Sequence, residues 1–145
     1  LSAGLIGGSL GAISTLVPAF IAHYLPRLRG LATGRGPWAI PWPCLHEFLA
    51  VVTHPRIYRP PTDLAVAIEA VEALVAVPTV QLLSETSDHF PILADLMKTP
   101  GLVGPKVHDA RIAAICLGHG GDALWSADRD FSWFPDLRVV NPLTG

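Results

Sequence analysis

The sequence predicts an α/β fold in which a central parallel sheet is flanked by helices. Short apolar runs alternate with longer segments of helical periodicity along the chain, and strands separated by helices usually pair in parallel. The chain has 145 residues, of which half are hydrophobic and 15% are charged. This length and composition are sufficient for a compact hydrophobic core. We therefore expect one domain overall.

The individual elements are predicted from apolar runs and the turn-forming residues between them. Short apolar runs predict strands at residues 38–40, 80–83, 123–126 and 137–140. Apolar residues that recur every three or four positions predict helices at residues 44–52, 63–77, 87–98 and 105–117. Thr62 is the expected N-cap of the second helix. The periodicity of that helix places four side chains in the core, namely Leu64, Ile68, Val71 and Val75.

The helix expected at residues 105–117 is almost free of charge. Pro105 is typical of a helix start, and Asp109 lies in the opening turn, where the helix dipole favours a negative charge. Past Asp109, only Arg111 is charged before the glycines at 118, 120 and 121. Little of this helix can therefore face water.

Three acidic residues are expected at the same edge of the sheet. Glu47 lies one turn into a helix that follows a strand, Asp109 lies in a first helical turn, and Asp128 follows the strand at residues 123–126. The carboxyl ends of parallel strands share one edge, where ligands bind. Carboxylates gathered there cannot all stay ionised without a cation. Oxygen ligands suit Mg²⁺ or Mn²⁺, and such an ion can polarise a phosphodiester and activate water.

Several motifs of this chain resemble those of the PIN-domain toxins of VapBC toxin–antitoxin modules. The resemblance covers roughly Pro37 to Leu143. It is carried by Glu47-Phe48, Val51-Val52-Thr53-His54-Pro55-Arg56, Val107-His108-Asp109-Ala110, Ser126-Ala127-Asp128-Arg129-Asp130-Phe131 and Leu137-Arg138-Val139-Val140-Asn141-Pro142-Leu143. It implies a PIN-like three-layer fold and an endoribonuclease that depends on Mg²⁺ or Mn²⁺. A cognate antitoxin protein would inhibit the enzyme, and the toxin would form homodimers.

The resemblance also implies the residues of the active site. Glu47, Asp109 and Asp128 match the acids that hold the metal in this family. Asp130 is the second acid of the same motif, and Ser126 stands where the family often has threonine. All four acids are expected to take part in catalysis.

The N-terminal region departs from the family pattern. The family begins with a strand that carries Asp, usually as Asp-x-Asn, and this Asp is a central metal ligand. The corresponding region here, around Gly4 to Ile13, contains no carboxylate. We therefore divide the chain into an atypical segment at 1–35 and a PIN-like region at 36–145, and expect impaired activity. The alternative is a catalytically inactive PIN-like module that still binds an antitoxin-like partner.

Residues 1–26 contain no Asp, Glu, Lys or Arg, and three interpretations compete for them. The segment is long enough to span a membrane, and its glycines are similar to a dinucleotide-binding turn. Against these stand the polar residues and Pro18 within it, and the absence of an acid before Glu47. We favour a buried or poorly ordered soluble segment, although a membrane-tethered version stays open.

Charge and cysteine content indicate how the protein could bind RNA and in which compartment it is found. The net charge of −2 gives no overall attraction to nucleic acid, so RNA binding requires a local basic face. Cys44 and Cys116 do not form a C-x-x-C pair and are expected to be buried thiols. Buried thiols are typical of a reducing compartment, which indicates a cytoplasmic location.

Overall fold

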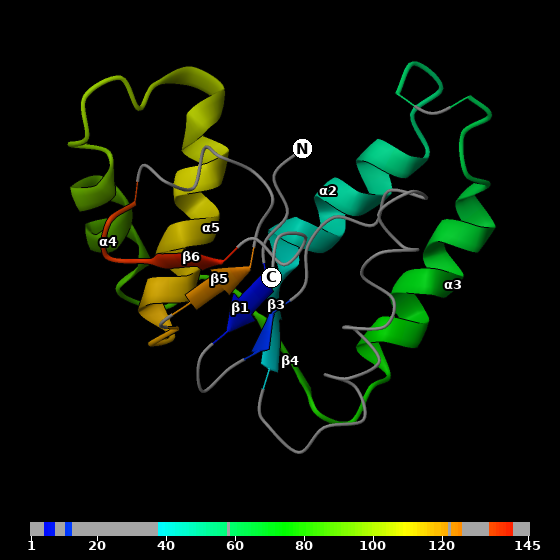
Figure 1. Cartoon of the computed structure of the whole chain (residues 1–145), viewed down its shortest axis with the longest axis horizontal. Helices are drawn as coiled ribbons and strands as arrows, with labels where there is room; N and C mark the ends of the chain where they lie inside the picture. Colours follow the sequence, from blue (N-terminus) through cyan, green and yellow to red (C-terminus); the bar gives the residue numbers. More distant parts are fainter. Residues whose placement is uncertain are drawn as a thin grey trace.

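The structure, a computed structural model, describes residues 5–7, 11–12, 38–57, 59–121, 123–125 and 134–140. Within these ranges, six strands form one sheet, with helices on both of its sides (Figure 1). The strands are β1 (Leu5–Gly7), β2 (Gly11–Ala12), β3 (Trp38–Pro41), β4 (Val80–Leu83), β5 (Ala123–Trp125) and β6 (Arg138–Val140). The helices are α2 (Trp42–Val52), α3 (Leu64–Val75), α4 (His89–Leu96) and α5 (Val107–Gly118), the last preceded by a 3-10 turn at Gly104–Lys106.

The arrangement confirms the predicted α/β fold with three layers. Helices α2 and α3 lie on one side of the sheet, and α4 and α5 lie on the other (Figure 1). The sheet order is β2-β3-β1-β5-β6, and β4 pairs with β3. Strands β2 and β4 are parallel to β3, and β5 is parallel to β6.

Strand β1 corrects the expectation of a wholly parallel sheet. It lies between β3 and β5 and is antiparallel to both, so β3 and β5 run in the same direction. No strand is predicted before residue 38, where the glycine-rich segment is expected to be buried or poorly ordered. Only three residues separate β1 from β2. Since β2 is parallel to β3 and β1 is antiparallel to β3, β1 and β2 run in opposite directions.

The N-terminal strands also bear on the interpretations of residues 1–26. Strands β1 and β2 occupy part of the glycine-rich run, whereas a dinucleotide-binding turn would follow a strand and open a helix. In the described parts of the chain, no helix combines the length and apolar character needed to cross a membrane.

The core lies between β3 and α5. Trp38, Ala39 and Ile40 of β3 are at most 1% exposed. The indole Nε1 of Trp38 donates a hydrogen bond to Thr79 Oγ1 at 2.7 Å, which satisfies the polar atom of this buried ring. Seven of the eight residues from 109 to 116 in α5 are buried, and Arg111 is the exception. The prediction that little of this helix faces water is confirmed.

Helix α3 confirms the predicted position but corrects the predicted core face. Leu64 and Ile68 are 60% and 42% exposed. Ala67 is buried instead, and Val71, Leu74 and Val75 pack against the core. The helix is apolar on nearly all sides, so its periodicity alone does not define one face. The Asp63 side chain, rather than that of Thr62, caps the helix by accepting a hydrogen bond from Ala65 N at 2.8 Å.

Both cysteines are buried and neither forms a disulfide, as expected. Cys44 lies on the inner face of α2, and Cys116 is fully enclosed within α5. Desolvation by burial, and then the proximity of Cys44, raise the pKa of the Cys116 thiol.

Gly118 marks a close contact between the end of α5 and the segment that leads into α4. A Cβ atom at Gly118 would lie 2.8 Å from Thr86 Oγ1 and 3.3 Å from Thr86 Cγ2. We expect Gly118→Ala to lower the free energy of unfolding by about 1 kcal/mol, because overpacking exceeds the gain in helix propensity. Urea denaturation would measure the change. The Thr86→Ala background should remove most of this cost, and an equal cost in both backgrounds would contradict the contact.

Candidate active site

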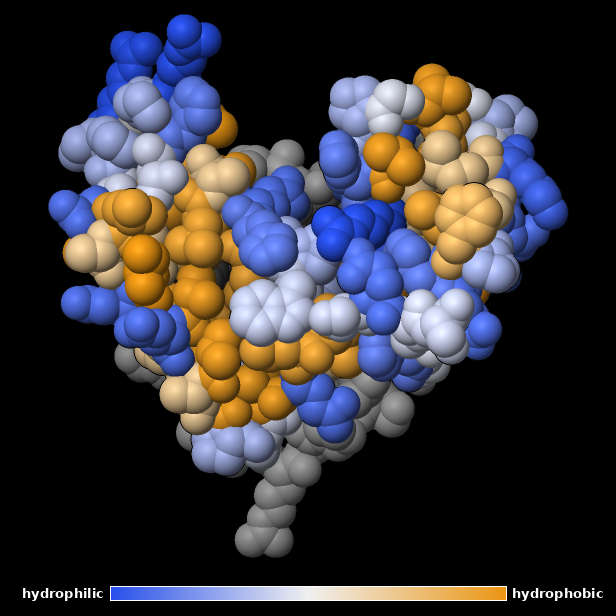
Figure 2. All heavy atoms as spheres, turned by 180° about the vertical axis from the view of Figure 1, so that it is seen from behind, coloured by the Kyte–Doolittle hydropathy of each residue, from blue (hydrophilic) through white to orange (hydrophobic). Residues whose placement is uncertain are grey.

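A hollow of about 420 Å³ lies between α2 and α5. Figure 2 shows hydrophilic residues between the arm that carries α2 and α3 and the arm that carries α4 and α5. The walls of the hollow are formed by seven residues of α2 and α5, namely Pro43, His46, Glu47, Ala50, His108, Arg111 and Ile112. The hollow therefore combines an apolar floor with charged and polar side chains.

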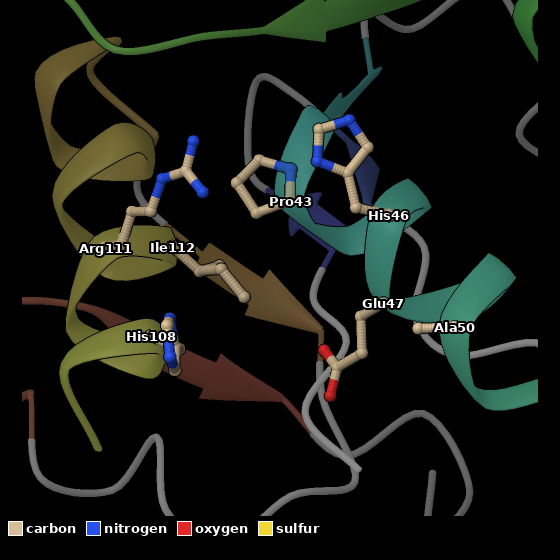
Figure 3. Close-up of a pocket in the computed structure, with 7 residues that line it drawn as sticks. All are labelled: Pro43, His46, Glu47, Ala50, His108, Arg111 and Ile112. Carbon is tan, nitrogen blue, oxygen red and sulfur yellow. The ribbon is translucent and has the colours of Figure 1, made fainter. Parts of the chain in front are cut away.

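Helix α2 positions Glu47 at one wall of the hollow. The helix starts directly after β3, with Pro43 in its first turn. Cys44, Leu45 and Phe48 are buried and fix the face that packs on the sheet. Glu47 lies at the edge of this face, as predicted, and is half-buried. Its carboxylate points into the space between α2 and α5 (Figure 3).

Helix α5 forms the opposite wall and carries Asp109 in its first turn. The Asp109 side chain is 8% exposed. Residues three apart on a helix are neighbours, so Asp109 lies beside Ile112, which lines the hollow. His108 faces the hollow across from Glu47 (Figure 3).

The direction of the strands places the start of α2 and the first turn of α5 at one edge of the sheet. Strands β3 and β5 run the same way, so their carboxyl ends lie at one edge of the sheet. Helix α2 starts at the end of β3, and α5 reaches β5 through a four-residue connection. A short connection makes α5 run opposite to β5, which brings the first turn of α5 to that same edge. Both helices thus begin at this edge, and the roles of Glu47 and Asp109 in one site stay a prediction.

The remaining predicted site residues, Ser126, Asp128 and Asp130, lie outside the described residues. They follow β5, which ends at Trp125. Within the described ranges, no group of three or more His, Cys, Asp or Glu side chains is arranged to hold a metal ion. The convergence of Glu47, Asp109 and Asp128 on one cation stays a prediction.

Arg111 was not predicted as a site residue, yet it lines the hollow and is held by an ion pair. Its Nε and Nη2 atoms both lie 2.5 Å from Glu85 Oε1. A hydrogen bond from the Glu85 backbone lowers the pKa of the Glu85 carboxyl, desolvation opposes this, and Arg111 lowers it further. The sequence did contain an indication of this pair. Arg111 is the one charged residue after Asp109 in a buried helix, and a charged side chain in such a helix requires a partner.

His46 also lines the hollow, next to Trp42. The ring centroids of the two side chains are 6.1 Å apart, with 32° between the ring planes. His46 is exposed, and its sequence position beside Glu47 was the available indication of a role.

Comparison with known proteins places the chain in a family. A sequence model of the PIN domain matches residues 22–137. The chain is a PIN-domain protein. It is 33% identical over 134 residues to Ribonuclease VapC48 of Mycobacterium tuberculosis, covering 90% of this chain and 83% of the relative. It is 35% identical over 125 residues to Ribonuclease VapC43 of Mycobacterium tuberculosis and to VapC ribonuclease Mb2897 of Mycobacterium bovis, covering 86% of this chain and 84% of each relative.

The PIN-domain match includes every predicted site residue from Glu47 to Asp130. It begins at residue 22, after the glycine-rich segment that contains β1 and β2. Residues 1–21 lie outside this match, and the acid-free part of the chain, residues 1–46, extends into it.

The Arg111–Glu85 pair predicts a specific dependence of stability on pH. Because the folded protein lowers the pKa of Glu85, the folded state binds fewer protons, and this contribution is lost as pH falls through the folded pKa. The pair is 41% and 36% exposed, so we expect a loss below about 1 kcal/mol. Urea unfolding over a series of acidic pH values should show a shallower decline for Glu85→Gln. Identical declines for the two proteins would contradict the prediction.

Proposed function

We propose that this PIN-domain protein is a divalent-metal-dependent endoribonuclease and the toxin of a type II toxin–antitoxin pair. The observation that carries the proposal is the meeting of two helices at one sheet edge, with Glu47 and His108 on facing walls of a hollow and Asp109 beside it. The ribonuclease names of the relatives support the same activity.

The donor chemistry fits a hard divalent cation. We assign Glu47, Asp109 and Asp128 as ligands, because carboxylate oxygens suit Mg²⁺ or Mn²⁺. When bound, the cation supplies Lewis-acid polarisation of the phosphodiester and acidifies water.

The protein residues supply position and proton transfer. Glu47 and Asp109 are held on helices that pack against the core, which keeps their carboxylates in fixed positions. A fixed carboxylate near the scissile phosphate can accept a proton from the attacking water. We assign Asp130 as the second acid of its motif, and Ser126 as a supporting hydroxyl at the end of β5.

A second candidate function is an inactive PIN-like module that binds an antitoxin-like partner. It is favoured by the absence of any acid before Glu47. Strand β1 lies at the centre of the sheet, yet it contributes no carboxylate. An active site that lacks a central ligand binds metal more weakly, and we therefore propose impaired activity of the enzyme.

The proposed partners follow from the same assignment. The substrate is RNA, the inhibitor is a cognate antitoxin protein, and the active unit is a homodimer in the cytoplasm. Exposed apolar side chains on α3, namely Leu64, Val66 and Ile68, favour protein contacts, because monomers rarely expose such groups together. Figure 2 shows apolar residues along the arm that contains α3.

Asp109→Asn tests whether this acid holds the cation. Removal of repulsion between neighbouring carboxylates should leave the protein equally or more stable in metal-free buffer. The rise in Tm on adding Mg²⁺ should shrink, and cleavage should fall roughly 100-fold or more. Thermal melts with and without Mg²⁺, together with RNA cleavage, would measure these effects.

Asp95→Asn is the matched control, since Asp95 lies on α4 and pairs with Lys98 at the surface. It should retain both the response to Mg²⁺ and the cleavage rate. If Asp109→Asn melts far lower in both buffers, then Asp109 is structural rather than a ligand.

The missing acid can be restored in a variant. We expect the unmodified chain to cleave RNA weakly at millimolar Mg²⁺, with partial rescue by Mn²⁺, which binds such sites more tightly. Replacing residues 1–22 with a strand that carries Asp-x-Asn should restore cleavage that depends on Asp109 and Asp128. A time course of RNA cleavage would compare the two proteins. Robust Mg²⁺-dependent cleavage by the unmodified chain would show that this acid is dispensable.

A further inference from the structure

The hollow between α2 and α5 has more features than metal binding requires. Of its lining residues, Glu47 is the one assigned to the metal. Pro43, which is half-buried, offers an apolar surface, and Ile112, 2% exposed, closes the hollow from below. Its volume of about 420 Å³ lies in the range of sites that enclose a small organic ligand, about 300–1,000 Å³.

Two planar side chains stand at the end of the hollow away from His108 (Figure 3). The His46 ring lies near that of Trp42. The Arg111 guanidinium is fixed by two contacts to Glu85 Oε1. Unstacked bases of single-stranded RNA bind by stacking on aromatic or histidine rings and on guanidinium planes. A guanidinium already held in place loses less conformational entropy when it binds such a base.

We propose that this hollow is a base-binding subsite, in which one unstacked nucleobase of single-stranded RNA lies on Pro43 between His46 and Arg111. The inference rests on the proposed nuclease function and names how the enzyme positions its substrate. A base held there brings the adjoining phosphodiester to Glu47, because Glu47 lines the same hollow. His46 and Arg111 are thus positioning residues, and the subsite selects unpaired RNA over duplex.

Two variants test the subsite without disturbing the core. His46→Ala removes an exposed ring, and Ala50→Trp fills the hollow from an exposed position of α2. The matched controls are His54→Ala in the loop after α2 and Ala73→Trp on α3, both exposed and outside the hollow. Circular dichroism and thermal melts would verify that all four variants fold.

The probes are two fluorescent 2′-O-methyl oligomers of equal length, one of mixed RNA sequence and one abasic. Binding is measured by fluorescence anisotropy in EDTA, so that no metal-dependent cleavage occurs. The protein should bind the base-bearing oligomer about tenfold more tightly than the abasic oligomer, a typical contribution of base stacking. His46→Ala and Ala50→Trp should remove most of this preference, while the two controls should retain it.

Metal-dependent cleavage of unmodified RNA, measured in parallel, separates this inference from the proposed function. Cleavage by the protein combined with unchanged base preference in both variants would overturn the subsite and leave the nuclease intact. Equal affinity for the two oligomers would also overturn the subsite. Loss of base preference in the two variants, without cleavage under any metal condition, would support the subsite and contradict the nuclease.

Discussion

The burial of helix α5 is the constraint on which the rest of the site depends. Six of its residues, Ala110 and Ile112 to Cys116, are at most 2% exposed, and each larger apolar side chain contributes about 1.5–3 kcal/mol when buried. Such a helix must be covered by other elements on almost every side. The polar side chains of α5 are therefore confined to its first turn and to the side that faces α2. These positions are occupied by His108, Asp109 and Arg111. The packing of the rest of the helix fixes where these three side chains lie relative to the hollow.

The sequence predicted the positions of the described helices and of β3 to β6, because their apolar runs are clearly bounded by proline, glycine or charged residues. It was less informative where the pattern was ambiguous. Helix α3 is apolar all round, so its buried face was set by packing of Ala67 and Val71 rather than by periodicity. Strands β1 and β2 have little strand propensity of their own, and their pairing with β3 is a tertiary effect.

The site was partly predictable for a similar reason. The expectation that Glu47 and Asp109 lie at one sheet edge followed from topology, since parallel strands bring their carboxyl ends to one edge. Their role as metal ligands stays a prediction. The pairing of Arg111 with Glu85 joins residues 26 positions apart, and no local pattern indicates such a contact. The direction of β1 was equally unpredictable from local sequence, yet it determines where an acid on this strand would lie. β1 runs antiparallel to β3 and β5, whereas a strand that carries an acid to the carboxyl edge of β3 and β5 has to run parallel to them.

The enclosed thiols have a practical consequence for work with this protein. Since burial raises the pKa of Cys116, its sulfur stays protonated in the folded state, and thiols react as thiolates. Alkylating reagents and oxidants can therefore modify Cys116 only when the α5 layer opens. Because Cys44 is also buried and the chain has two cysteines, the rate of thiol labelling reports opening of the interior. The two thiols thus report how often the folded state opens locally.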